Sequence, residues 1–128
     1  MYSELERNLP GHPDWEGSFY EKLTEYGEWD VNAFWKLHLD FLEIAKSVNG
    51  SNTISRDLAR KLLLLQQKVL NLVSSHFNDN DVYEIANIET DLLYEFIERF
   101  EMAILGAVSG EVHPESSFGL VNPLVKNA

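Results

Sequence analysis

The apolar residues of this chain recur every three or four positions over three long segments. The first runs from Phe34 to Val48, the second from Leu58 to Leu72, and the third from Ile85 to Ala107. Apolar positions at this period line one face of an α-helix, whereas a half-buried strand alternates every second residue. The pattern predicts an all-α fold, a helical bundle of three long helices.

A short N-terminal helix is expected to precede these three. Ser18 has Glu21 three residues after it, which is the spacing of a capping box, and Gly27 can end the helix in a left-handed conformation. This helix is predicted over about 18–26. The residues before it are expected to be irregular, because two prolines and two glycines interrupt residues 10–17.

Caps and turn residues also set limits for the long helices. Asp30 is an N-cap for a helix ending near 48, and Ser55 is one for a helix over about 55–77. The turn Asn78-Asp79-Asn80-Asp81 opens the last helix, predicted over about 81–108. A helix of that length favours a bend near its middle.

The chain 1–128 is expected to form a single helical domain, because it is long enough to bury a core without disulfides or metal. The last stretch, 110–128, contains prolines but is too apolar for a free tail. We expect it to pack across the bundle as a short strand or an extended C-terminal arm.

A second apolar stripe lies on the helix predicted over 30–48. Trp35, Leu39 and Leu42 fall on a face nearly opposite the main seam. A helix that is apolar on two sides is either central in its domain or half exposed at an interface. The stripe therefore leaves the choice between monomer and dimer open.

Charge is unevenly distributed along a chain whose formal net charge is −11. Residues 1–50 carry ten acids against four bases, and residues 79–128 carry ten against two. Residues 51–78 carry four bases against one acid. A magnitude of roughly 2–8 usually keeps a small domain dissolved. Because this field repels nucleic acid and anionic membrane, we expect a basic protein partner, no nucleic acid and no membrane.

No residue pattern predicts catalysis, a metal or another cofactor. The histidines at 12, 38, 76 and 113 lack ligand spacing and are expected at surface or half-buried positions. Asp79, Asp81 and Glu84 begin like a calcium loop, but its glycine and bidentate glutamate are missing, so they are interpreted as helix caps. Ser75 and His76 are adjacent on a helix, where side chains diverge by about 100°. We expect no enzyme.

One candidate binding surface is a row of carboxylates. It consists of Glu84, Asp91, Glu95 and Glu98, spaced to share one face of the helix predicted over 81–108. Such a row is usually solvated surface, yet like charges one turn apart are mildly destabilising. Arg99 is the only nearby cation. A docked basic partner would explain why the row stays unneutralised.

A second candidate surface lies near the N-terminus, where acids alternate with aromatic residues. Its partner-binding candidates are Glu25, Glu28, Trp29 and Asp30. Aromatic anchors ringed by carboxylates are typical of hot spots that bind basic proteins. Of the rings in this segment, Phe19 is expected in the core, and Tyr20 and Trp29 at the surface.

An acidic, cysteine-free helical chain with the segment Trp29-Asp30-Val31-Asn32-Ala33-Phe34-Trp35 resembles bacterial immunity proteins of contact-dependent growth-inhibition and polymorphic-toxin systems. The resemblance lies in composition and helix pattern. It implies binding to a cognate toxin domain, often a basic nuclease, in the cytoplasm of the producing cell. A cytoplasmic location also fits the lack of cysteine and of a signal-peptide pattern.

Two other functions remain open. The chain could be a helical adaptor or dimerising regulatory protein that binds another basic protein. It could also be a small enzyme or ligand-binding bundle, which a buried pocket with converging polar groups would favour.

Overall fold

The computed structural model describes residues 2–126, and all regular structure within them is helical. The all-α prediction is confirmed. In chain order the elements are α1 (Ser3–Arg7), α2 (Phe19–Tyr26), α3 (Val31–Val48), α4 (Arg56–His76), α5 (Thr90–Ser109) and the 3-10 turn η1 (Glu115–Ser117).

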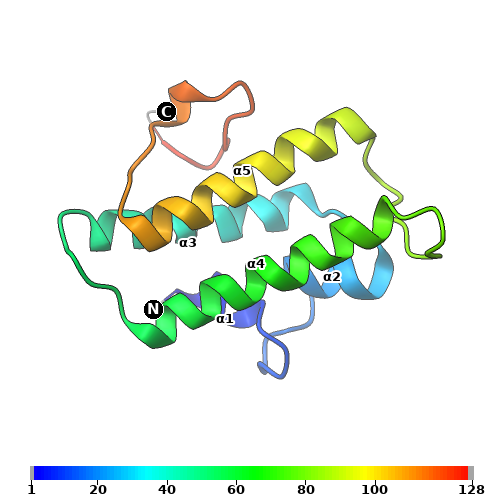
Figure 1. Ribbon diagram of the computed structural model, residues 1–128, viewed down its shortest axis with the longest axis horizontal. Helices are drawn as coiled ribbons and strands as arrows, with labels where there is room; N and C mark the ends of the chain where they lie inside the picture. The colour runs from blue at the N-terminus through cyan, green and yellow to red at the C-terminus, as the bar shows by residue number, and fades with distance from the viewer. Residues whose placement is uncertain (1, 127–128) are drawn as a thin grey trace.

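The three long helices run side by side, with α4 opposite in direction to α3 and α5 (Figure 1). The most extensive packing joins α3 to α5, while α1 packs on α3 and α4 packs on α5. Aromatic rings fill the α3–α5 contact. The Phe34 ring centroid lies 5.2 Å from that of Phe96, and the Phe41 centroid lies 6.0 Å from that of Phe100.

The predicted helix caps are confirmed for α2, α3 and α4. The Ser18 hydroxyl accepts a hydrogen bond from the Glu21 backbone N–H, and the Asp30 carboxylate accepts one from Ala33. Ser55 caps α4 in the same way. Gly27 ends α2 with φ +60°, the left-handed conformation expected for it. Capping residues close in the sequence therefore predicted where these helices begin and where α2 ends.

The N-terminal segment is more ordered than predicted, because it contains α1. Leu5 is fully buried, and its backbone N–H donates to the Asp40 carboxylate of α3 at 2.9 Å. Arg7 donates to the backbone oxygens of Asp14 and Glu16 at 2.9 and 2.6 Å. The buried Asn8 also accepts from the Tyr20 N–H at 2.7 Å. These contacts hold a segment whose prolines and glycines suggested irregular chain.

The last long helix begins at Thr90 and has 20 residues, so the predicted start near Asp81 is wrong. Residues 78–89 form a loop, here called the 78–89 loop. Its first residues form a turn in which the Asp81 N–H donates to the Asn78 carbonyl at 3.0 Å, and two later backbone N–H groups donate to residues outside the loop. The Ala86 N–H donates to the Gly27 carbonyl at 2.9 Å, and the Ile85 N–H donates to His76 Nδ1 at 3.0 Å.

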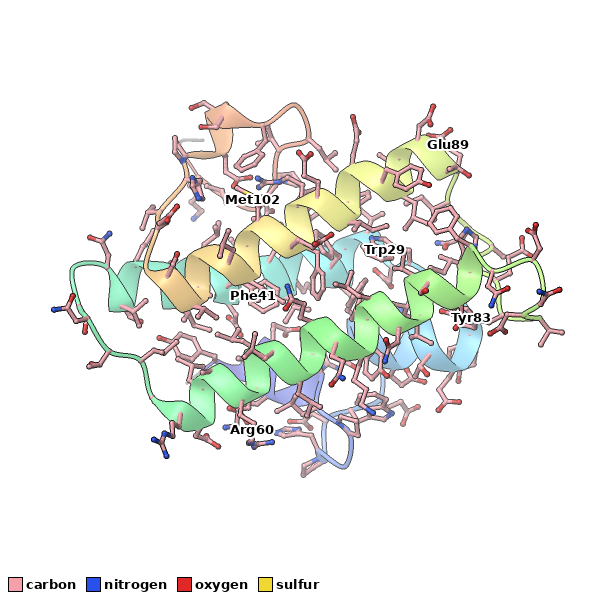
Figure 2. The ribbon with its side chains drawn as sticks, viewed as in Figure 1. Trp29, Phe41, Arg60, Tyr83, Glu89 and Met102 are labelled. Atoms are coloured by element: carbon pink, nitrogen blue, oxygen red, sulfur yellow. The ribbon has the colours of Figure 1, made fainter. Side chains whose placement is uncertain are left out.

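Two aromatic residues expected at the surface are buried, so that part of the interpretation is wrong. Trp29 is 0% exposed, and its ring centroid lies 4.8 Å from that of Phe19. Figure 2 shows Trp29 among the helices. Tyr20 is also buried, whereas Phe19 is in the core as predicted. Burying these large rings removes more apolar area from water than any aliphatic alternative.

The C-terminal segment, residues 110–126, lies along the side of α3 and α5 that faces away from α4 (Figure 1). It contains η1 and no strand within the described residues. The buried Asn122 side chain donates to the Trp35 carbonyl of α3 at 3.1 Å. Trp35 is buried, while Leu39 and Leu42 are half-buried. The second stripe of α3 is therefore largely covered by the chain itself.

Candidate functional site

The acidic row predicted for the last helix lies on the outer face of α5. Asp91, Glu95 and Glu98 are all exposed, and Glu101 extends the row by one further turn. Sequence reasoning missed Glu101, although it follows Glu98 at the same helical spacing. Glu89 lies at the outer edge of the molecule (Figure 2), where its carboxylate caps α5 by accepting from the Leu92 N–H at 2.8 Å.

Glu84 does not share the face of α5, because it belongs to the 78–89 loop. It is exposed, as predicted, but its position depends on Gly27 rather than on helical spacing. The Glu84 carbonyl oxygen lies against Gly27, where an added Cβ would come within 2.2 Å of it. The predicted row of four is therefore a row on α5 with a separate carboxylate on the adjoining loop.

The nearby cation does not neutralise these acids. Arg99 is 3% exposed and pairs with Glu115 on the inner side of α5. Residues 79–101 hold eight acids, and Arg99 is their only base. Across residues 2–126, none of those eight carboxylates forms an ion pair. The carboxylates on this face therefore repel one another, and a cationic partner would relieve that repulsion.

Two exposed aromatic rings lie beside the acidic row. The Phe77 and Tyr94 rings are stacked, with centroids 5.1 Å apart and an interplanar angle of 7°. Phe77 is 40% exposed and Tyr94 is 55% exposed. Sequence reasoning missed both, although Tyr94 falls three residues after Asp91 and four before Glu98. The stack supplies the apolar anchor expected for a protein-binding surface.

The 78–89 loop is held firmly against α2 and the start of α3. Asn87 accepts from the Trp29 backbone N–H at 2.8 Å and donates to the Trp29 carbonyl at 2.9 Å. The Tyr83 hydroxyl donates to the Leu23 carbonyl, and burial raises the pKa of Tyr83 to about 12. At the loop's tip the Val82 side chain is fully exposed. A pinned loop that displays an apolar side chain limits the ordering cost of binding.

The N-terminal candidates are only partly available to a partner. Trp29 is buried, and Asp30 both caps α3 and pairs with Lys22 at 2.5 Å. Burial opposes the shift, but the hydrogen bonds from Lys22 and from the α3 backbone lower the pKa of Asp30. Glu25 is exposed and Glu28 is half-buried. Of the four N-terminal candidates, only the carboxylates of Glu25 and Glu28 therefore remain available for binding a partner.

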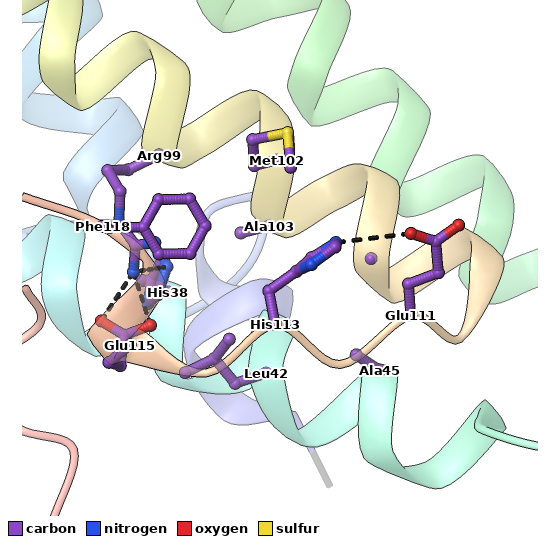
Figure 3. Close-up of a pocket in the computed structure, with 11 residues that line it drawn as sticks. His38, Leu42, Ala45, Arg99, Met102, Ala103, Glu111, His113, Glu115 and Phe118 are labelled. Atoms are coloured by element: carbon purple, nitrogen blue, oxygen red, sulfur yellow. Dashed lines mark hydrogen bonds and ion pairs between the residues drawn. The ribbon is translucent and has the colours of Figure 1, made fainter. Parts of the chain in front are cut away.

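A buried polar network lies on the opposite side of α5 (Figure 3). Arg99 Nη2 donates to both carboxylate oxygens of Glu115, at 2.6 and 2.5 Å, and lies 3.2 Å from His38 Nε2. The Phe118 ring lies over the guanidinium, 3.7 Å from Cζ. This network joins α3, α5 and the C-terminal segment.

His38 is fully buried, not at the half-buried or surface position expected for it. Groups that only donate face both ring nitrogens, because Arg99 Nη2 lies 3.2 Å from Nε2 and Asn122 Nδ2 lies 3.0 Å from Nδ1. These neighbours disfavour a second proton on the ring. Burial, reinforced by the charge of Arg99, lowers the pKa of His38 to about 3. The ring is therefore neutral at neutral pH.

A small cavity adjoins this network between α3, α5 and the C-terminal segment. Its volume of about 20 Å³ is room for about one water molecule. Arg99 Nε has no hydrogen-bond partner among residues 2–126, and His113 Nε2 lies 3.5 Å from Glu111 Oε2. Polar groups do converge here, as the ligand-binding alternative requires, but the space is far below the ~300 Å³ of a small-molecule site.

Two further findings bear on the function classes considered above. Within residues 2–126, no three histidine or acidic side chains come together as metal ligands. Over the same residues, no helix combines the length and apolar character that a membrane crossing requires. Comparisons with protein-family models, with curated protein sequences and with solved structures found no match to this chain.

Proposed function

We propose that this protein binds and neutralises a basic bacterial toxin domain through the outer face of α5 and the adjoining 78–89 loop. The observation that carries the proposal is the run of exposed acids without an exposed base, beside the stacked rings of Phe77 and Tyr94. The exposed acids of this binding face are Asp79, Asp81, Glu84, Glu89, Asp91, Glu95, Glu98 and Glu101.

Each part of this face supplies a different requirement of an inhibitor. The carboxylates steer a cationic protein and can raise the association rate to about 10⁸–10⁹ M⁻¹s⁻¹ at low salt. Phe77, Tyr94 and Val82 supply apolar area at the centre of the contact. The bonds of Asn87 and Tyr83 hold the 78–89 loop in place before the partner arrives. Binding would then lose little conformational entropy.

The action proposed is that of an immunity protein in the cytoplasm of the cell that makes the toxin. Inhibition of this kind occludes the toxin's own site and uses no catalytic group, metal or cofactor of the inhibitor. A basic nuclease is the toxin class that fits best, because a row of carboxylates presents charge in the manner of a phosphate backbone. Glu25 and Glu28, at the end of α2, would lie at the rim of the contact.

The test is co-expression with each candidate toxin domain encoded beside the gene for this chain. Restored growth and co-purification in a 1:1 complex are the expected results. Persistent growth arrest in cells that contain folded protein would contradict the proposal. A helical adaptor using the same acidic face would bind a basic protein without rescuing growth, so the growth measurement separates the two functions.

A further inference from the structure

Tyr94 occupies a distinctive position on the binding face. Phe77 stacks on the Tyr94 ring at 5.1 Å, while 55% of Tyr94 stays exposed. Asp91 precedes Tyr94 by three residues and Glu98 follows it by four, so both acids share its face of α5, one turn away on either side. Both carboxylates are exposed. An exposed ring thus stands between two unpaired carboxylates.

We infer that this position binds an arginine side chain of the basic partner, in preference to lysine. This inference rests on the proposed function and adds to it the chemistry of the contact. A planar guanidinium can lie on the open part of the Tyr94 ring and extend the stack that Phe77 begins. Its fork of N–H donors can reach carboxylates beside the ring, whereas a lysine ammonium is a compact, strongly hydrated point charge.

The chain makes a contact of this kind internally. The Phe118 ring lies 3.7 Å from Arg99 Cζ, while the same guanidinium donates to the Glu115 carboxylate. That buried site combines an aromatic face with a carboxylate around one arginine. The surface site of Tyr94, Asp91 and Glu98 offers the same two kinds of group to an arginine from outside.

Tyr26 provides a matched control. It is 71% exposed and is flanked in the sequence by the acids Glu25 and Glu28. Among the described residues, no aromatic ring stacks on it. Loss of Tyr26 should therefore leave arginine preference at α5 unchanged.

The experiment titrates the protein with two blocked peptides, one of four arginines separated by glycines and one with lysines in their place. Binding is followed by NMR chemical shifts at about 0.15 M salt, where weak long-range attraction is screened. We expect the arginine peptide to bind about fivefold more tightly and to shift the Tyr94 ring signals. In Tyr94→Leu the difference between peptides should vanish, and in Tyr26→Leu it should persist.

Equal binding of the two peptides by the wild-type protein would overturn the inference, and so would an arginine preference that survives Tyr94→Leu. If both peptides bind equally and Glu95→Lys with Glu98→Lys weakens both, the acidic face still attracts cations and the proposed function stands without arginine selectivity. If neither peptide binds, the inference fails together with the charge-based part of the proposed function. Circular dichroism of each variant confirms that the helices remain folded.

Discussion

Gly27 lies so close to Glu84 that a Cβ on the glycine would come within 2.2 Å of the Glu84 carbonyl oxygen. This contact joins the end of α2 to the 78–89 loop. It occurs where Gly27 has φ +60°, a conformation that side chains disfavour.

Gly27→Ala should therefore destabilise the protein more than an alanine at another left-handed glycine. Gly50 has φ +80°, and apart from its chain neighbours no described residue has an atom within 4 Å of the Cβ that alanine would add. Gly50→Ala therefore reports the conformational cost alone, about 1–2 kcal/mol. Gly27→Ala adds the displacement of the loop backbone to that cost. Urea unfolding followed by tryptophan fluorescence measures both. Equal losses would show that the close approach is not maintained in solution.

The helix caps could be predicted from the sequence, whereas the 78–89 loop could not, because its contacts join residues far apart in the chain. Ser18, Asp30 and Ser55 cap their own helices through hydrogen bonds to residues three positions later, so local spacing was enough to find them. Residues 78–81 form a turn as predicted, but residues 81–89 were misread as helix because their apolar spacing is helical. The Ala86 and Ile85 N–H groups bond to Gly27 and His76 outside the loop, and helical spacing reveals neither partner.

One part of the candidate site could be predicted from the sequence and another part could not. The exposed acids on α5 could be predicted, because helical spacing alone places Asp91 and Glu95 on one face. The pairing of Phe77 with Tyr94 could not, because it depends on how α4 packs on α5. Arg99 was misplaced for a related reason, since its partner Glu115 comes from the C-terminal segment.

Two leucines of α4, one buried and one exposed, form a matched pair for substitution. Leu65 is 1% exposed and Leu63 is 51% exposed, although both lie within a run of four leucines. Leu65→Ala should cost about 2–5 kcal/mol, because it leaves a cavity in the core. Leu63→Ala should change the free energy of unfolding by less than about 0.5 kcal/mol. Thermal or urea unfolding of the two variants measures the difference, and similar losses would mean that the face of α4 is misassigned.

The ion pair of Arg99 and Glu115 should be costly to break on one side only. Glu115→Leu leaves the guanidinium buried without its carboxylate and should lower the free energy of unfolding by about 3–5 kcal/mol. Adding Arg99→Met removes the stranded charge and should restore part of that loss. Unfolding of the single and double variants gives the coupling. A single variant that loses under about 1 kcal/mol would indicate that water reaches the pair.

The buried His38 side chain should make the folded protein less stable in acid. Its pKa is about 3 in the folded protein, against about 6.5 when unfolded, so between these values only the unfolded chain binds the proton. Stability from this residue is therefore complete above pH 6.5 and falls toward pH 3, by up to about 1.4 kcal/mol per pH unit. His38→Gln removes this contribution. Unfolding measured from pH 7 to pH 4 should show a shallower decline in the variant, and parallel curves would contradict the assignment.

We propose that the acidic face of α5 attracts a basic partner. The association rate with a toxin domain that co-purifies with the protein, measured over a series of salt concentrations, tests this proposal. Glu95→Lys with Glu98→Lys should slow association markedly and flatten its salt dependence, because charge at the rim acts chiefly on the on-rate. The control, Glu43→Lys with Glu111→Lys, makes the same change in net charge at exposed positions away from this face. The control should associate with the toxin domain at a near wild-type rate. Equal rates in both double variants, or a wild-type rate indifferent to salt, would contradict it.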